Sequence, residues 1–470
     1  CLMEIHGGLV LAVADDPGMH SSQNEQDTRF LTDFAHTICL EPKNQQDAYD
    51  MTRKAFQLSE RFHIPVVVRL VTRLSHARSV IARTPAPPRN DLGKAIDRTK
   101  WMTLPALARK GWAHLLEQQR EFTTWSEESP FNTLDLNPEF TDFAVITSGL
   151  GGNYYAENES ELPMRPSRLH VGTYPVPTEK ILRLAESAKR LVLIEEGYPY
   201  IERQLRSILG QPVEIRGKMD GTVPLQGELN ADNVRTALGL AERSTVHVPT
   251  PATNMRTGES PSLIEALPGR PPQLCRGCPH IFSFQALNEA REGLPASIVT
   301  SDIGCYALGA LPPYNAVETI LCMGASIGMA KGAAEAGQAN VVATIGDSTF
   351  FHSGIQGLID AVSAGAHMTI VILDNGTTGM TGGQDTVAPG STIREIAIGA
   401  GVDPDHVVLI DPIPKKHVEN VEIYRRELAY NGVSVVIPVR ECVQTKLQRA
   451  RRPAKTEDAV KTASAKTESA

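Results

Sequence analysis

The sequence predicts a multi-domain α/β protein with doubly wound parallel sheets. Apolar runs, among them residues 64–71, 340–347 and 368–375, alternate with helical segments. This alternation is typical of parallel sheets that helices cover on both faces. A chain of 470 residues is too long for one ordinary domain. Stretches rich in Pro, at 83–90 and 251–273, interrupt the alternation and divide the chain into three α/β blocks.

Each block has its own expected strands and helices. In the first block we expect strands at 8–16 and 64–71 around a helix at 45–62. The connector after it contains all three tryptophans, and we expect it to be irregular and to pack on other domains. In the second block, 168–177 reads as one strand, and helices fall at 178–189 and 199–208. In the third, the strands are 297–304, 340–347, 368–375, 406–411 and 433–440, with helices near 281–292, 325–337, 353–364 and 416–430.

The expected domain boundaries follow from these blocks. The tail is polar and has no apolar period, so we expect it to be disordered. The parts are 1–82, a connector 83–140, a central α/β domain 141–250, a linker 251–274, a third α/β domain 275–448 and the tail 449–470.

Charge and hydropathy argue against two classes of protein. A formal net charge of −8 argues against a nucleic-acid binder, which would carry a basic face. No run of about 18 or more apolar residues is present, so we expect no membrane span. No signal peptide is visible, so we expect a cytoplasmic protein whose seven cysteines do not form a disulfide framework.

Polar residues follow two strands of the third block. Asp347 ends one strand and Asn375 ends another, and ligands of open parallel sheets bind at such strand ends. Together with Thr377 these residues offer hard oxygen ligands suited to Mg²⁺, and Gly346 and Gly379 let the backbone approach a diphosphate. The alternative is that the Gly-Asp and Asn-Gly pairs only form turns, as they do in many loops.

The Gly-Asp turn and the Asn 28 residues later resemble the signature of thiamine diphosphate enzymes. The continuation "GMTGGQ" resembles the 2-oxoacid:ferredoxin oxidoreductase family. The resemblance implies that Asp347, Asn375 and Thr377 hold Mg²⁺. It also implies a cofactor site lined by Gly346, Ser348, Gly379 and Met380, to which the match of 323–337 adds Gly324, Ala325 and Ser326. For Met380 the alternative is core packing.

Four cysteines of the third block are candidate ligands of an iron–sulfur cluster. They are Cys275, Cys278, Cys305 and Cys442, and four thiolates from one domain fit one [4Fe–4S] cluster. The Cys-x-x-Cys pair alone could equally be half a zinc site, a redox pair, or without function. The family resemblance favours the cluster. Cys39 and Cys322 lie in apolar surroundings, and we expect them to be buried.

The stretch 9–29 most resembles the large subunit of the indolepyruvate:ferredoxin oxidoreductases, and the resemblance extends over nearly all of 1–442. It implies that 1–82 is the C-terminal part of a pyrimidine-binding domain, and that His20 or Asn24 contacts the 2-oxoacid or a partner. The alternative is that this loop only turns. Two departures are the lack of a C-terminal ferredoxin-like module and of the glutamate that activates thiamine, so we expect a fragment or a variant that passes electrons to another subunit.

The implied activity is oxidative decarboxylation of an arylpyruvate to an aryl-acetyl-CoA, with electrons passed through iron–sulfur centres to ferredoxin. The resemblance also implies coenzyme A as co-substrate, a smaller β subunit and a hetero-oligomer. Arylpyruvate rests on the resemblance alone, since no residue identifies an aromatic pocket. Two alternatives stay open: a non-oxidative thiamine diphosphate decarboxylase or carboligase, and a non-catalytic cofactor-binding subunit.

Overall fold

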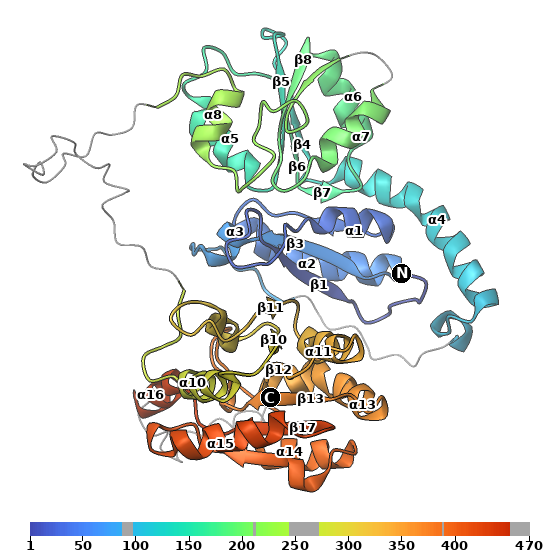
Figure 1. Ribbon diagram of the computed structural model, residues 1–470. Helices are drawn as coiled ribbons and strands as arrows, with labels where there is room; N and C mark the ends of the chain where they lie inside the picture. The colour runs from blue at the N-terminus through green and yellow to red at the C-terminus, as the bar shows by residue number, and fades with distance from the viewer. Residues whose placement is uncertain (87–96, 210–212, 244–271, 388–389, 452–470) are drawn as a thin grey trace, which may run out of the picture. The chain divides into compact units, whose positions relative to one another are not determined.

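The computed structural model describes residues 1–86, 97–209, 213–243, 272–387 and 390–451. The chain divides into two compact units, residues 1–248 and 249–470 (Figure 1), each with its own sheets and core. Most of the expected linker 251–274 and of the expected tail lies outside the described residues.

The unit of residues 249–470 is built on one parallel sheet of six strands. Their order is β11-β10-β12-β13-β17-β16, and every neighbouring pair is parallel. The strands are β10 (Ile298–Ser301), β11 (Thr319–Ile320), β12 (Val341–Gly346), β13 (Met368–Leu373), β16 (Val407–Ile410) and β17 (Val433–Pro438). All residues of β12, β13 and β17 are buried, as expected for central strands covered on both faces.

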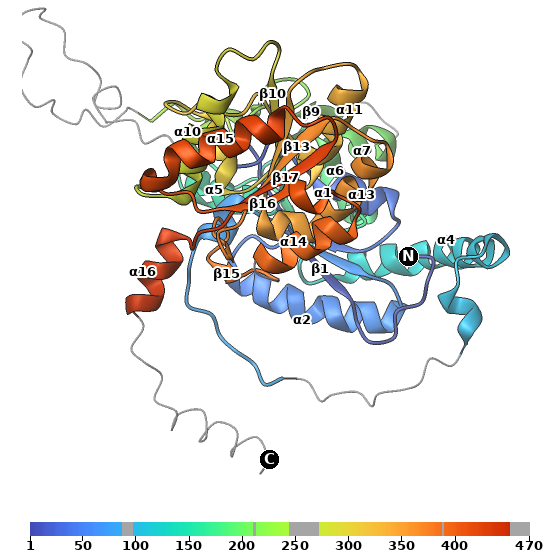
Figure 2. The same cartoon turned by 60° about the horizontal axis from the view of Figure 1, so that its bottom comes forward.

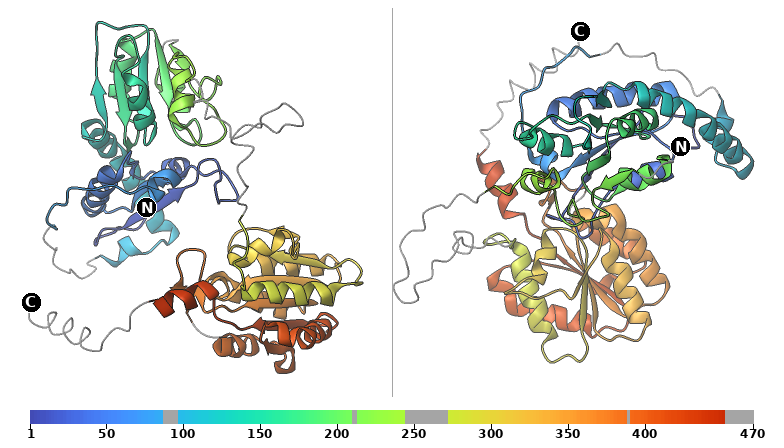
Figure 3. Two further views of the ribbon diagram at one scale, coloured as in Figure 1. Left: turned by 90° about the vertical axis from the view of Figure 1, so that its left-hand side faces the viewer. Right: turned by 90° about the horizontal axis from the view of Figure 1, so that it is seen from above.

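Helices cover both faces of this sheet, as the right-hand view of Figure 3 shows. One core contains apolar residues of α11 (Ala325–Glu335), α13 (Ile355–Ser363) and α14 (Gly390–Gly399). The core on the other face contains residues of α10 (Pro279–Arg291) and α15 (His417–Leu428). The predicted α/β fold class is therefore confirmed.

The unit of residues 1–248 contains two sheets. In the first, β1 (Val10–Asp15), β3 (Val66–Val71) and β2 (Cys39–Leu40) are parallel, and β7 (Thr173–Tyr174) pairs antiparallel with β2. The expected helix at 45–62 is α2 (Gln45–Phe62), which begins where the Asn44 side chain accepts a hydrogen bond from the Asp47 N–H.

The second sheet of this unit has five strands in the order β4-β6-β5-β8-β9. Its strands are β4 (Thr133–Asp135), β5 (Ala144–Ser148), β6 (Arg168–Val171), β8 (Arg190–Ile194) and β9 (Glu214–Arg216). Only β4 is antiparallel to its neighbour, so the sheet is parallel except at one edge. The shorter helices of the unit are α1 (Thr28–Phe34), α3 (Thr72–His76), α5 (Gly151–Glu159), α6 (Thr178–Glu186), α7 (Tyr200–Ile208) and α8 (Ala231–Ala237).

The prediction of a single strand at 168–177 is wrong, because this segment forms two strands in two different sheets. The chain leaves the five-stranded sheet at Gly172, and the next two residues join the other sheet as β7. The Asn132 side chain holds this crossing, because its Oδ1 accepts hydrogen bonds from the N–H groups of Gly172 (2.8 Å) and Thr173 (2.9 Å). The first and second blocks of the sequence therefore share one sheet.

The connector expected to be irregular is mostly a helix, α4 (Pro105–Glu128). It begins with Pro at its first position, which suits a helix start. Leu115, Phe122 and Trp125 are spaced seven and three residues apart, so they lie on one helix face, and all three are buried in the core beneath the first sheet. Trp125, one of the three tryptophans of this connector, belongs to this helical pattern.

The chain end of the described residues is helical as well. Helix α16 (Val443–Arg451) lies beside the short hairpin of β14 (Thr377–Thr378) and β15 (Gln384–Asp385), as Figure 2 shows. The first residues of the expected disordered tail are therefore helical. Among the described residues, no helix is long and apolar enough to cross a membrane.

Candidate active site

The carboxyl ends of three adjacent strands carry the acidic residues of the candidate site. Asp302 follows β10, Asp347 follows β12, and Asp374 follows β13. Gly346 pairs in register with Leu373, so the turns after β12 and β13 leave the sheet at the same level. Parallel strands therefore bring these side chains to one edge of the sheet.

Asp347 faces a second carboxylate. It is buried, and both its Oδ2 and the Oδ1 of Asp374 accept a hydrogen bond from the Gly376 N–H, at 3.1 Å and 3.0 Å. The pKa of Asp347 is raised to about 7, mainly by burial and also by the charge of the neighbouring Asp374. A divalent cation would relieve the repulsion between the two carboxylates, so the donor set fits a magnesium ion.

Asn375 and Thr377 complete the predicted magnesium ligands. The Asn375 Oδ1 accepts a hydrogen bond from the Thr377 N–H (3.0 Å), and its Nδ2 lies 3.2 Å from the His280 Nε2. Burial lowers the pKa of His280 to about 4, so the neutral ring can accept this hydrogen bond. The Thr377 hydroxyl donates to the Gln384 carbonyl (2.8 Å), and this bond holds the hairpin beside the site.

A cavity of about 90 Å³ lies at this edge of the sheet. Its lining includes most of the predicted cofactor residues: Gly346, Asp347, Ser348, Asn375, Thr377, Gly379 and Met380. Tyr306 and Met323 also line it, and neither was predicted. Met380 is 52% exposed, so the alternative that it packs in the core is wrong.

The remaining predicted cofactor residues, at the start of α11, do not line this cavity. Gly324 has φ +83°, a left-handed conformation that favours glycine. The Ser326 side chain is buried, and its hydroxyl donates to the Asp302 Oδ2 (2.7 Å). A role of Gly324, Ala325 and Ser326 at the cofactor stays a prediction.

The four predicted cluster cysteines lie close together. A methyl group placed on Gly379 would lie 3.3 Å from the Cys305 Sγ and 3.9 Å from the Cys442 Sγ. The pKa of Cys278 is raised to about 12, mainly by burial and also by the charges of Cys275, Cys305 and Cys442. The Cys305 and Cys442 thiols thus lie next to Gly379 of the cavity, and Cys275 and Cys278 are near enough for the charges of the four thiols to interact, which suits a cluster ligated by four thiolates.

A site for a single metal ion and a site for an iron–sulfur cluster place different demands on the positions of their ligands. Within the described ranges, no three His, Cys, Asp or Glu side chains are placed to hold one metal ion. A four-iron cluster binds each thiolate to a different iron atom, so its ligands need not meet at one point. The expectation of a buried Cys322 is wrong: it is exposed in the loop after the edge strand β11, whereas Cys39 is buried as expected.

His20 and Asn24 lie in the other unit. The exposed His20 ring has its Nε2 3.1 Å from the Glu228 Oε2, and the Asn24 Nδ2 donates to the Glu25 carbonyl (3.0 Å). Both contacts hold the loop in place, and a role of either residue toward substrate stays a prediction.

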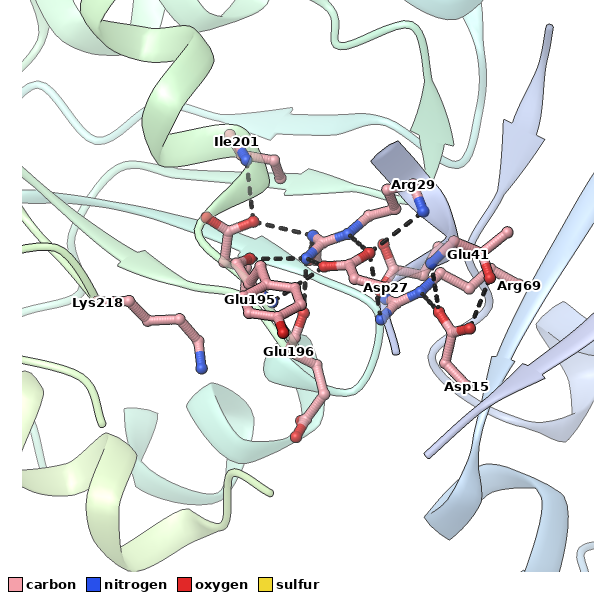
Figure 4. A network of polar contacts seen from close by, with 12 residues as sticks. Asp15, Asp27, Arg29, Glu41, Arg69, Glu195, Glu196, Ile201 and Lys218 are labelled. Carbon is pink, nitrogen blue, oxygen red and sulfur yellow. Dashed lines mark hydrogen bonds and ion pairs between the residues drawn. The ribbon is translucent and has the colours of Figure 1, made fainter. Parts of the chain in front are cut away.

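A buried ionic network in the unit of residues 1–248 was missed by the sequence analysis (Figure 4). Arg29 donates to Asp27 (2.5 Å) and to the Glu195 Oε2 (2.9 Å). Arg69 donates to Asp15 and to Glu41, each at 2.5 Å. Both guanidinium groups are fully buried. The available signal was an arginine in the middle of the apolar strand 64–71.

The comparisons with known proteins place the chain in a family. Residues 302–413 match the family described as "Thiamine pyrophosphate enzyme, C-terminal TPP binding domain". The "Indolepyruvate oxidoreductase subunit IorA" of Archaeoglobus fulgidus is 36% identical over 93% of this chain and 70% of that protein. The chain belongs to the indolepyruvate oxidoreductase subunit IorA family. The IorA protein of Pyrococcus abyssi is 35% identical over 96% of this chain and 73% of its own length.

Among solved structures, a 2-oxoglutarate:ferredoxin oxidoreductase from Magnetococcus marinus is similar with a TM-score of 0.32 and 17% identity. The match covers 38% of this chain and 70% of that chain. Membership of the IorA family makes the chain an oxidoreductase subunit with a thiamine-diphosphate-binding domain.

Proposed function

We propose that the chain catalyses the oxidative decarboxylation of a 2-oxoacid of the indole-3-pyruvate type to the corresponding aryl-acetyl-CoA. One 2-oxoacid and one coenzyme A thiol give carbon dioxide, the thioester, a proton and two electrons. Two ferredoxins take up these electrons one at a time. The observation that carries the proposal is that the Cys305 and Cys442 sulfurs lie against Gly379, a residue of the cofactor cavity.

The protein's own residues hold and orient the cofactor in this proposal. Asp347 and Asn375, with Thr377, would hold Mg²⁺, which would neutralise the charge of the diphosphate group of thiamine diphosphate. Thiamine diphosphate, when bound, supplies the nucleophilic carbon and the electron sink for decarboxylation. The neutral His280 holds the Asn375 amide in one orientation, since the two side-chain nitrogens lie 3.2 Å apart.

In this proposal a [4Fe–4S] cluster is held by four cysteines: Cys275, Cys278, Cys305 and Cys442. Cys305 and Gly379 both line the cavity, so the cluster would adjoin the cofactor and take its electrons directly. The non-oxidative alternative gives no reason for four thiols to meet at this place.

Partners and location follow from the same proposal. The relatives are named as one subunit of an oxidoreductase, which favours a smaller partner subunit and a hetero-oligomer. We propose a cytoplasmic enzyme that interacts with neither nucleic acid nor membranes. In the loop between β1 and α1, His20 or Asn24 would contact the 2-oxoacid or the partner subunit.

Iron and acid-labile sulfide content tests the proposal first. The 470-residue chain is purified without oxygen and assayed colorimetrically beside Cys275→Ala. Cys322→Ala is the matched control, because Cys322 is an exposed thiol outside the four. We expect about four irons per chain, lost in Cys275→Ala and kept in Cys322→Ala. Absence of iron in a folded chain that binds thiamine diphosphate would refute the cluster.

The substrate is tested on the complete enzyme with its partner subunit. Reduction of a viologen dye is followed with coenzyme A and either indole-3-pyruvate or pyruvate. We expect faster reduction with indole-3-pyruvate. Equal rates would contradict the arylpyruvate assignment, and dye reduction by neither acid would contradict the oxidative reaction.

A further inference from the structure

Asp302 is a buried carboxylate that the sequence analysis did not single out and that does not line the cavity. It directly follows β10, between the strands β11 and β12. The chain after β11 reaches Gly324, and the chain after β12 reaches Asp347. Asp302 therefore sits between the two segments that approach the cofactor site.

One oxygen of Asp302 fixes the start of α11. Its Oδ2 accepts hydrogen bonds from the Gly324 N–H (3.1 Å), the Ser326 N–H (3.4 Å) and the Ser326 hydroxyl (2.7 Å). A carboxylate at a helix N-terminus is favoured by the free N–H groups and the helix dipole. Asp302 thus holds the turn that presents Met323 to the cavity.

The other oxygen fixes Tyr306. The Tyr306 hydroxyl donates to the Asp302 Oδ1, and its ring lies against the backbone of the Gly346 turn. A methyl group placed on Gly346 would lie 2.6 Å from the Tyr306 Cε1. Tyr306 is buried and follows Cys305 directly, so its position also sets that of the Cys305 thiol.

We propose that Asp302 is a positioning residue, whose two carboxylate oxygens hold the Met323–Ser326 turn and the Cys305–Tyr306 segment in the arrangement that binds thiamine diphosphate. It acts through Tyr306 and through the start of α11, without contact to the cofactor. The inference rests on the proposed function, since it concerns the same cavity.

Two variants and a matched control test this role. Asp302→Asn keeps the shape of the side chain and removes its charge. Tyr306→Phe removes only the hydroxyl that donates to Asp302. Glu427→Gln is the control, because Glu427 is a buried carboxylate of the same unit that bonds His406 (2.8 Å) and does not line the cavity.

The dissociation constant for thiamine diphosphate with Mg²⁺ is measured by calorimetric titration of the full chain, together with its melting temperature. We expect Asp302→Asn to raise the dissociation constant by about tenfold and Tyr306→Phe by about threefold, from the usual worth of hydrogen bonds to a charged group. Tyr306→Phe in the Asp302→Asn background should add little, because the two residues form one network. Glu427→Gln should lower the melting temperature and leave the dissociation constant unchanged.

Hydrogen exchange of the cofactor-free chain gives a second readout. Asp302→Asn should speed exchange in both 303–310 and 322–328, whereas Glu427→Gln should not. Unchanged exchange in either segment, or binding by Asp302→Asn as tight as that of Glu427→Gln, overturns the inference. If Asp302→Asn does not fold, Tyr306→Phe decides the binding question alone. A wild-type chain that binds no cofactor would contradict the proposed function, while the exchange measurement would still decide the role of Asp302.

Discussion

Glu196 gives a prediction about pH and stability. It follows β8 and is fully buried, and its Oε1 accepts a hydrogen bond from the Leu229 N–H (2.8 Å). Its pKa is raised to about 7, mainly by burial and in part by the Glu228 charge. We predict that Glu196→Gln stabilises the protein at pH 8, because the wild type must keep there a charge that burial has removed from water.

The magnitude follows from the pKa difference. Between the ordinary value of 4.5 and about 7 the folded chain holds a proton that the unfolded chain releases. The contribution of Glu196 to the free energy of unfolding is therefore largest below pH 4.5 and is lost as the pH rises through 7. The difference corresponds to about 3 kcal/mol in total, of which about 2 to 3 kcal/mol falls between about pH 5 and pH 8.

Tryptophan fluorescence is a suitable assay, because all three tryptophans lie in residues 1–248, the unit that contains Glu196. Urea unfolding of wild type and Glu196→Gln at pH 5 and pH 8 gives the two differences in free energy. The gain from the substitution should be larger at pH 8. The exposed Glu157→Gln controls for loss of a charge at the surface. A gain that is equal at both pH values, or larger at pH 5, would refute the reasoning.

Two further predictions concern other buried features. Arg29→Met should lower the free energy of unfolding by about 3 to 5 kcal/mol in the same fluorescence assay, because it removes the guanidinium group that pairs with the buried carboxylates of Asp27 and Glu195. A loss below about 1 kcal/mol would contradict this. Gly324→Ala should weaken thiamine diphosphate binding in calorimetric titration. A methyl group at this position would lie 2.1 Å from the Ser353 Oγ, and the φ of Gly324, +83°, is unfavourable for alanine. Gly328→Ala, on the same helix with open space around it, should bind normally, and equal affinity of the two variants would count against the predicted role of Gly324.

Features set by local pattern were predictable from the sequence. Helix α2 has the expected bounds 45–62, because Asn44 caps its start and its apolar residues recur with helical spacing. The strands β12 and β13 were evident as apolar runs, and the rule for strand ends brought Asp347 and Asn375 to one cavity. The chemical roles of these residues stay predictions.

Features that depend on distant partners were not predictable. The Arg29–Glu195 pair joins residues 166 positions apart, and nothing in either local sequence names the other. Nothing in the local sequence distinguishes Tyr306 from other aromatic residues, and only the structure shows its ring against Gly346. Likewise, the two residues of β7 are too few to carry a periodic signal, and their pairing with β2 depends on Asn132, about 40 positions away.

The crossing at Gly172 has a consequence for cutting the chain. β2 contributes only Cys39 and Leu40, and β7 covers its outer side. A fragment that stops before Thr173 would leave that side open, and open strand edges recruit strands from other molecules. Residues 1–82 expressed alone should therefore self-associate, whereas residues 1–248 contain β7 together with the complete five-stranded sheet and keep the outer side of β2 paired.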